Sequence, residues 1–239
     1  MHLIRYAYVL SCSVLVAACG GSPPKAQDAN SETSRPKRDY DPTSQIGATA
    51  EVGALPEEET QYAMKESFDG IRRCFVTGSR RIEFLGGEIA LNVTVGAQGH
   101  VKGVFAERST LGDRETEKCM FDAVKHTSWP KPVGGPIGIA QAAFDFEMSG
   151  DVRPPVSWEP DRISQALSRE SSTLAACKSD PSVNYQATVY VGTDGRVLAA
   201  GVSAPSRNAE EASDCLVQAL LGVSFPEPGS WPAKVSFSI

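Results

Sequence analysis

The chain has 239 residues, of which 41% are apolar, and its 23 basic and 29 acidic side chains give a net charge of −6 and a pI near 5.2. This acidity argues against a nucleic-acid-binding protein that relies on phosphate contacts, so we expect no nucleic-acid partner. The apolar fraction suffices for ordinary cores, and the length allows one or two domains.

Residues 1–18 have the features of a lipoprotein signal peptide. A positive charge precedes an apolar run over 6–15 that is too short to remain as a membrane-spanning helix, and small residues then lead to Cys19. This end of the segment resembles the bacterial lipobox, which implies a mature chain that begins at Cys19 and is anchored in the membrane by its acyl chains. The alternative is an ordinary secretory signal that is cleaved after Ala18. The glycine after the cysteine implies, by analogy with well-studied bacteria, sorting to the outer membrane. We expect this lipoprotein to face the periplasm, and surface exposure is the alternative.

Residues 19–56 are rich in glycine, serine, proline and charged residues and contain few large apolar side chains. Such a composition cannot bury enough surface to offset the entropy of ordering. We therefore predict a lipidated, disordered tether over 19–56.

Residues 57–149 form the first predicted domain. Apolar residues recur at helical spacing from 57 onward, and strict alternation marks the strand that follows. The expected elements are a helix that starts at 57, strands over 89–95 and 101–105, a helix that ends before Trp129-Pro130, and a closing strand over 142–146.

Residues 150–160 contain three prolines and are predicted to form a linker, after which residues 161–239 form the second domain. The expected elements are a helix that starts at 161, strands over 185–191 and 197–201, a helix that ends before Phe225-Pro226, and a closing strand over 235–239.

The two domains are an internal duplication. Gly99 and Gly195 lie ninety-six residues apart, and the distance from the valine two residues later to the next cysteine is eighteen residues in both copies. An aromatic-proline pair follows each cysteine at the same distance. Because apolar, turn, cysteine and proline positions all agree, we infer that one folding unit occurs twice. The first copy has about seven additional residues near 78–86.

Four cysteines remain outside the signal peptide and the lipidation site: Cys74, Cys119, Cys177 and Cys215. In an exported protein they are expected to form two disulfides, and domains this small need such cross-links. Of the three possible pairings, the repeat favours Cys74–Cys119 and Cys177–Cys215. A metal site is the alternative use, but the spacing of the cysteines and the lack of neighbouring histidines argue against it.

These patterns predict an α+β protein with two tandem α-β-β-α-β domains. Each domain would have an antiparallel three-stranded sheet with both helices on one face, and the other face would be left to solvent.

The stretch Asp194-Gly195-Arg196-Val197, the helix after it, Phe225-Pro226-Glu227-Pro228 and the closing strand resemble the C-terminal domain of TonB. With its cysteines, the chain is similar to the AgmX/PglI C-terminal type found in envelope and gliding proteins of myxobacteria and their relatives. The resemblance covers residues 57–149 and 158–239 and implies a periplasmic protein-binding or scaffolding module. TonB has a transmembrane anchor and a long proline-rich spacer, which this chain lacks, so energy transduction is not implied.

We find no pattern that points to catalysis, a metal or a cofactor. His100 stands where the second copy has Arg196, and His126 lies near a helix end, where its partial charge suits the helix dipole. No nucleotide-binding, hydrolase or metalloprotease motif occurs. We therefore expect a protein that is not an enzyme and holds no cofactor and no metal.

The hypothesis from the sequence is a non-catalytic, lipid-anchored cell-envelope protein whose two domains bind or organise an envelope protein partner. The expected binding surface is the exposed edge of a closing strand. Its candidate residues are Ala142, Phe144, Phe146, Val235, Phe237 and Ile239. Two alternatives are a ligand-binding receptor or enzyme with a site between the domains, and a structural tether between the outer membrane and the cell wall.

Overall fold

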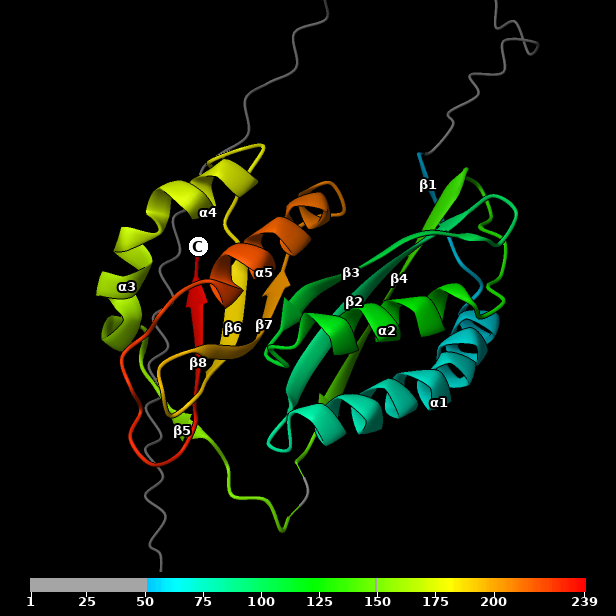
Figure 1. Ribbon diagram of the computed structural model, residues 1–239. Coiled ribbons are helices and arrows are strands. Elements are labelled where there is room, and N and C mark those ends of the chain that lie inside the picture. Colours follow the sequence, from blue (N-terminus) through cyan, green and yellow to red (C-terminus); the bar gives the residue numbers. More distant parts are fainter. Residues whose placement is uncertain (1–50, 149) are drawn as a thin grey trace, which may run out of the picture. The chain divides into compact units, whose positions relative to one another are not determined.

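A computed structural model of the chain describes residues 51–148 and 150–239, which belong to one compact unit spanning residues 47–239 (Figure 1). These residues form five α-helices, two short 3-10 helices and two four-stranded sheets, which confirms the predicted α+β class. No helix within the described ranges has both the length and the apolar composition needed to cross a membrane. The predicted signal peptide, most of the predicted tether and Cys19 lie outside the described residues.

The first repeat forms one sheet with two helices on a single face. Its elements are β1 (Val52–Gly53), α1 (Glu57–Arg81), β2 (Gly87–Gly96), β3 (Val101–Ser109), α2 (Arg114–Lys125) and β4 (Ile137–Phe146). The strand order is β1-β4-β2-β3, in which β2 is antiparallel to both of its neighbours and β1 is parallel to β4. In Figure 1, α1 (cyan) and α2 (green) lie on the same side of this sheet.

The second repeat has the same strand order, β5-β8-β6-β7. Its elements are β5 (Val156–Ser157), η1 (Pro160–Ile163), α3 (Ser164–Arg169), α4 (Ser171–Cys177), β6 (Gln186–Val191), β7 (Val197–Ser203), η2 (Ala209–Ala212), α5 (Ser213–Leu221) and β8 (Ala233–Ser238). Here too β6 is antiparallel to its two neighbours, and the additional strand is parallel to the closing strand.

The prediction of three-stranded antiparallel sheets is wrong, because each sheet gains a fourth strand that runs parallel to its closing strand. β1 lies in the segment predicted to be tether, and β5 lies in the predicted linker. Each has two residues, too few to show the alternation by which a strand is recognised in a sequence. A backbone hydrogen bond from Trp158 N to Lys234 O (2.9 Å) extends the β5–β8 pairing, and next to β1 the residue Ala54 forms an isolated antiparallel bridge with Val133 (Ala54 N to Val133 O, 2.9 Å).

The first predicted helix of the second repeat is broken into η1, α3 and α4. Glu170 separates the last two with φ −98° and ψ 7°. The hydroxyls of Ser168 and Ser171 donate to the backbone carbonyls of Ser164 and Ser168. Because such side-chain bonds compete with the helical ladder, a serine-rich stretch is a poor continuous helix.

The glycine turn and the aromatic-proline pair occur together in both repeats because they touch. Gly99 and Gly195 have φ values of +79° and +78°, which favour glycine. A Cβ on Gly99 would overlap the carbonyl oxygen of Trp129, and one on Gly195 would overlap that of Phe225. Each hairpin turn therefore lies directly against the chain segment that ends the second helix of its own repeat.

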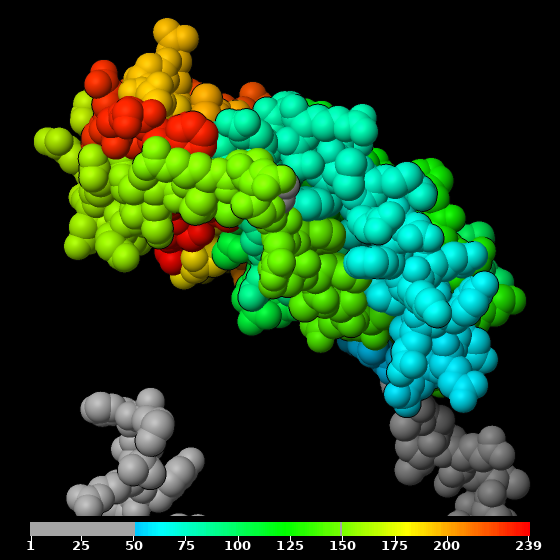
Figure 2. All heavy atoms as spheres, turned by 90° about the horizontal axis from the view of Figure 1, so that it is seen from below, coloured from blue at the N-terminus to red at the C-terminus, as the bar shows by residue number. Residues whose placement is uncertain are grey.

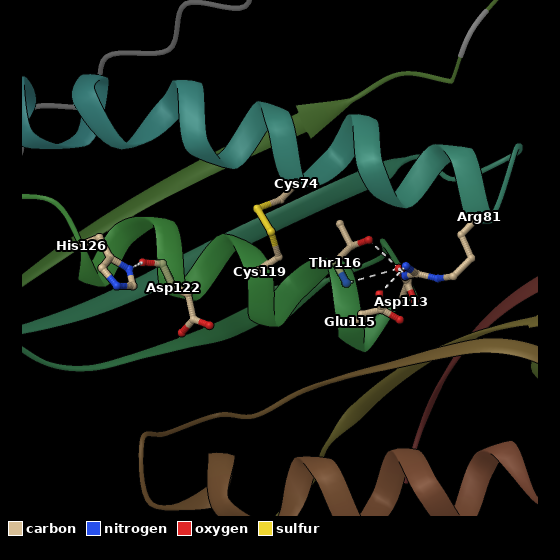
Figure 3. Close-up of a disulfide and its surroundings, with 8 residues drawn as sticks. All are labelled: Cys74, Arg81, Asp113, Glu115, Thr116, Cys119, Asp122 and His126. Atoms are coloured by element: carbon tan, nitrogen blue, oxygen red, sulfur yellow. Dashed lines mark hydrogen bonds and ion pairs between the residues drawn. A yellow bond between two sulfur atoms is a disulfide. The ribbon is translucent and has the colours of Figure 1, made fainter.

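The disulfides Cys74–Cys119 and Cys177–Cys215 are both present and have the pairing expected from the repeat. Figure 3 shows the first of them joining α1 to the middle of α2. Beside it, Arg81 at the end of α1 forms ion pairs with Asp113 and Glu115 at the start of α2. Asp113 also caps α2, because its carboxylate accepts a hydrogen bond from the backbone N–H of Thr116.

The outer face of the second sheet, opposite its helices, is buried against the first repeat. Thr188 is 1% exposed, and Tyr190 is fully buried. The hydroxyl of Thr188 donates to the carbonyl of Ser109 (3.4 Å), and that of Tyr190 donates to the carbonyl of Gly86 (3.3 Å). The prediction that the outer face of each sheet is left to solvent is therefore wrong for the second repeat.

The apolar part of this contact comes from the residues by which the first repeat is longer. The end of the 78–86 segment carries Ile82, Phe84 and Leu85, which are buried in one cluster with Tyr190 and Ala199 of the second repeat. The Phe84 and Tyr190 rings lie 5.4 Å apart between centroids. The additional residues thus supply the apolar part of the contact that joins the two repeats.

Candidate functional site: the free edge of strand β4

Strand β4 has one fully paired edge and one edge that is mostly open. Its inner edge pairs with β2 over all ten residues, from Ile137 to Phe146. Its outer edge pairs with β1 only at Ile137 and Gly138. Within the described ranges no strand pairs with the outer edge from Ile139 to Phe146. That stretch contains no lysine, arginine or proline, the residues that usually block addition of a further strand.

Alternate β4 side chains point toward the helices, where they form an aromatic cluster with α1. The ring of Phe144 stacks on that of Phe68 at 5.8 Å between centroids, and the ring of Phe146 stacks on that of Phe75 at 4.7 Å. Phe68 remains 41% exposed. In Figure 2 the green segment that contains β4 reaches the surface beside α1 (cyan). A strand added to the open edge would therefore have an aromatic surface on its helix side.

The other face of β4 carries the exposed residues Ile139, Gln141, Ala143 and Asp145. Asp145 lies directly opposite Glu88 on β2. Like charges at such a position destabilise a sheet, and a cation from an added strand would relieve this repulsion.

Two adjoining hollows, of about 260 and 350 Å³, lie on this outer face of the first sheet. Ala90, Arg108 and Ala143 line both. The two alanine side chains are small and therefore leave space at the bottom of the hollows. Arg108 is the one cationic residue in the lining of either hollow. The outer face therefore offers room for side chains of a bound partner next to the edge.

The closing strand of the second repeat is a much poorer edge. Val235 and Phe237 are 1% and 5% exposed and therefore offer no apolar surface beside the edge, and the hydrogen bonds that the backbone of Ile239 exchanges with Tyr185 (2.9 and 3.0 Å) lie on the inner edge. β5 pairs with the first two residues of β8, so only 235–238 remain without a further strand among the described residues. The two sets of predicted edge residues belong to different sheets and do not form one site.

Polar side chains of both repeats also meet at a cavity of about 780 Å³ between α2, β7 and α5. The guanidinium of Arg114, on α2, donates to Glu210 and to Asp214, both at 2.7 Å. Lys118 donates to Asp214 as well, at 2.9 Å. Burial lowers the pKa of Arg114, but the charge of Glu210 and the hydrogen bonds to the two carboxylates raise it overall.

Glu117 is the most unusual ionisable residue of this contact and was not singled out from the sequence. Its side chain is fully buried, with one oxygen accepting from the hydroxyl of Ser109 (2.6 Å) and the other without a hydrogen-bond partner. Burial raises its pKa to about 7, although Ser109 and Arg114 act in the opposite direction. One signal was available, because Glu117 lies three and four residues before the apolar residues Met120 and Phe121, a spacing that places side chains on one face of a helix.

No three histidine, cysteine, aspartate or glutamate side chains lie close enough to hold a metal ion in the part of the chain that the structure describes. No protein-family model, curated protein or solved structure matches this chain.

Proposed function

We propose that this chain is a non-catalytic, lipid-anchored cell-envelope protein that binds a partner protein by strand addition at the outer edge of β4. The observation that carries the proposal is the run from Ile139 to Phe146, which has an open edge and contains no lysine, arginine or proline. The resemblance to TonB-type domains supports the same class of function.

The chemistry of the edge describes the partner segment. It would be an extended segment of about eight residues that forms main-chain hydrogen bonds to β4. Its apolar side chains would pack on Phe68 and Phe144, and a lysine or arginine on its other face would lie near Asp145 and Glu88.

The proposal is tested with a photo-crosslinking residue in place of Gln141, which is exposed on β4. A second protein carries the same photo-crosslinking residue together with Phe68→Glu, which removes the apolar surface beside the edge. Tyr62→Glu is the matched control, because Tyr62 is 66% exposed on α1 but lies six residues away and thus on a different side of the helix.

We expect a cross-linked partner chain in native envelopes with the parent protein and with Tyr62→Glu. Loss of a buried aromatic contact is typically worth at least a tenfold change in affinity, so Phe68→Glu should reduce the cross-linked product by about tenfold. Equal yields from both variants, or no cross-linked protein at all, would contradict strand addition at this edge.

The lipid anchor is tested separately at Cys19. We expect Cys19→Ala to abolish fatty-acid labelling and to shift the protein from the membrane fraction to the soluble fraction. Labelling that persists in this variant would exclude Cys19 as the acylated residue.

A ligand-binding function between the repeats is the second candidate, and the 780 Å³ cavity with charged side chains from both repeats favours it. Arg114 and Lys118 would then hold an acidic ligand. Their charges are already opposed by Glu210 and Asp214, which is why we place this function second.

A further inference from the structure

Lys234 occupies a strand position at which a charged residue is unexpected. It lies on the outer face of β8, opposite Tyr190 of β6, where the first repeat places Ile139 opposite Thr94. Its side chain therefore lies on the side of the first repeat and is half-buried.

The ammonium group of Lys234 has few partners. Its Nζ donates to the carbonyl of Gly86 (2.6 Å) and lies 5.2 Å from the centre of the Tyr190 ring. No carboxylate lies within ion-pair distance of it among the described residues. An ammonium group can donate three hydrogen bonds, so this one retains capacity for an anionic partner. Burial without such a partner lowers the pKa of Lys234 to about 8.

A cavity of about 440 Å³ adjoins this ammonium group, where β4 ends and the chain crosses to the second repeat. In Figure 2 the crossing segment (lime green) runs from the end of β4 toward the red C-terminal part. The apolar residues of its lining are Phe84, Phe146, Met148, Val152 and Pro155. Lys234 is the one cation in the lining, and the exposed Glu147 is the one carboxylate.

We propose that this cavity binds an organic monocarboxylate with an apolar tail, whose carboxylate accepts hydrogen bonds from Lys234. Buried charges in proteins are normally paired, and a carboxylate would supply the missing partner. The aromatic and aliphatic walls match an apolar tail, as in most small-molecule sites.

The chemistry of the lining excludes other ligand classes. A dianion such as a phosphate would meet one cation and the carboxylate of Glu147, which leaves its charge poorly balanced. A peptide would bring several backbone amides into walls that are mostly apolar, where each unpaired amide is costly. This site does not depend on strand addition at β4.

The test uses residues 47–239, the compact unit that contains both cores and both disulfides. Calorimetric titration at pH 6.5 measures binding of octanoate, its neutral analogue octanamide and octylammonium. We expect saturable binding of octanoate, at least tenfold weaker binding of octanamide, and none of octylammonium, since hydrogen bonds between charged groups typically contribute that much.

Two variants locate the site. Lys234→Met should weaken octanoate binding about tenfold or more and leave octanamide unchanged. Lys178→Met is the matched control, because Lys178 also donates to a backbone carbonyl and lies beside a tyrosine ring, but outside the cavity. Val152→Trp should fill the cavity without touching the ammonium group, and it answers the question even if Lys234→Met fails to fold.

The pH dependence gives an independent readout. Octanoate affinity should fall about tenfold per pH unit above pH 8, where Lys234 loses its proton. No saturable octanoate binding, equal binding of octanoate and octanamide, or equal loss in the Lys178→Met control would overturn the proposal. Preference for a peptide with a free C-terminus over octanoate would overturn the assigned ligand class.

Discussion

Replacing Glu117 by glutamine should stabilise the protein at alkaline pH and have little effect at acidic pH. Its carboxyl is fully buried between the repeats, and burial raises its pKa from 4.5 to about 7. Between pH 4.5 and about pH 7, Glu117 is protonated in the folded protein, whereas the same carboxyl has lost its proton in the unfolded chain. The free energy of unfolding therefore falls as the pH rises, by about 1.4 kcal/mol per pH unit, and the loss is complete above pH 7.

The structure gives a magnitude for this loss. From pH 4.5 to about 7 it amounts to about 3 kcal/mol in the free energy of unfolding. A glutamine has the shape of the protonated carboxyl and can still accept from the hydroxyl of Ser109, but it does not ionise. We therefore expect Glu117→Gln to match the parent protein at pH 4.5 and to be more stable by up to about 3 kcal/mol at pH 8.

Chemical denaturation at pH 4.5, 6, 7 and 8, with both disulfides intact, measures the difference. Glu115→Gln is the matched control, because Glu115 lies on the same helix with a side chain that is 74% exposed. Its effect should stay below about 1 kcal/mol, because the interactions of exposed charges are screened by solvent. A Glu117→Gln difference that is the same at pH 4.5 and pH 8 would refute the burial argument. So would a carboxyl carbon NMR titration with a midpoint near 4.5.

Three further changes test the fold. Gly99→Ala should lower the free energy of unfolding by about 2 kcal/mol or more, measured by thermal or chemical unfolding. Gly134→Ala is the control, because Gly134 has a similar positive φ but open space around it, and this change should cost only about 1 kcal/mol. Equal effects of the two changes would contradict the contact at the turn. Phe84→Ala should cost about 3–5 kcal/mol, because this ring is 6% exposed in the contact between the repeats, and a loss below 1 kcal/mol would show that the contact does not form in solution. Cys177→Ser with Cys215→Ser should lower the free energy of unfolding by about 4 kcal/mol, because the bridge closes a separation of 38 residues, and an unchanged unfolding midpoint would argue against that disulfide.

The structural features that occur in both repeats, the hairpins and the disulfides, could be predicted well from the sequence. The positions of Gly99 and Gly195, each followed by a valine and a cysteine at equal distances, located the hairpins and indicated the disulfide pairing. These are local signals, in which a turn needs a positive φ and a strand needs alternation. Two independent copies of each signal agreed, so the pattern could be separated from chance.

Features that arise from contact between the copies could not be predicted in this way. Thr188 and Tyr190 alternate with the core residues of β6 and were expected to face solvent, but the first repeat covers them. The same contact buries Glu117, a residue type that is ordinarily exposed. Periodicity reports which face a residue is on, but not what lies against that face.

The difference between the copies explains why the proposed binding surface lies on the first repeat. The 78–86 segment lets the first repeat cover the outer face of the second sheet, while the second repeat lacks these residues and cannot cover the first sheet in return. The outer face of the first sheet accordingly keeps its hollows at Ala90 and Ala143, and β4 keeps its open edge. The asymmetry leaves one sheet to stabilise the pair and the other available to a partner.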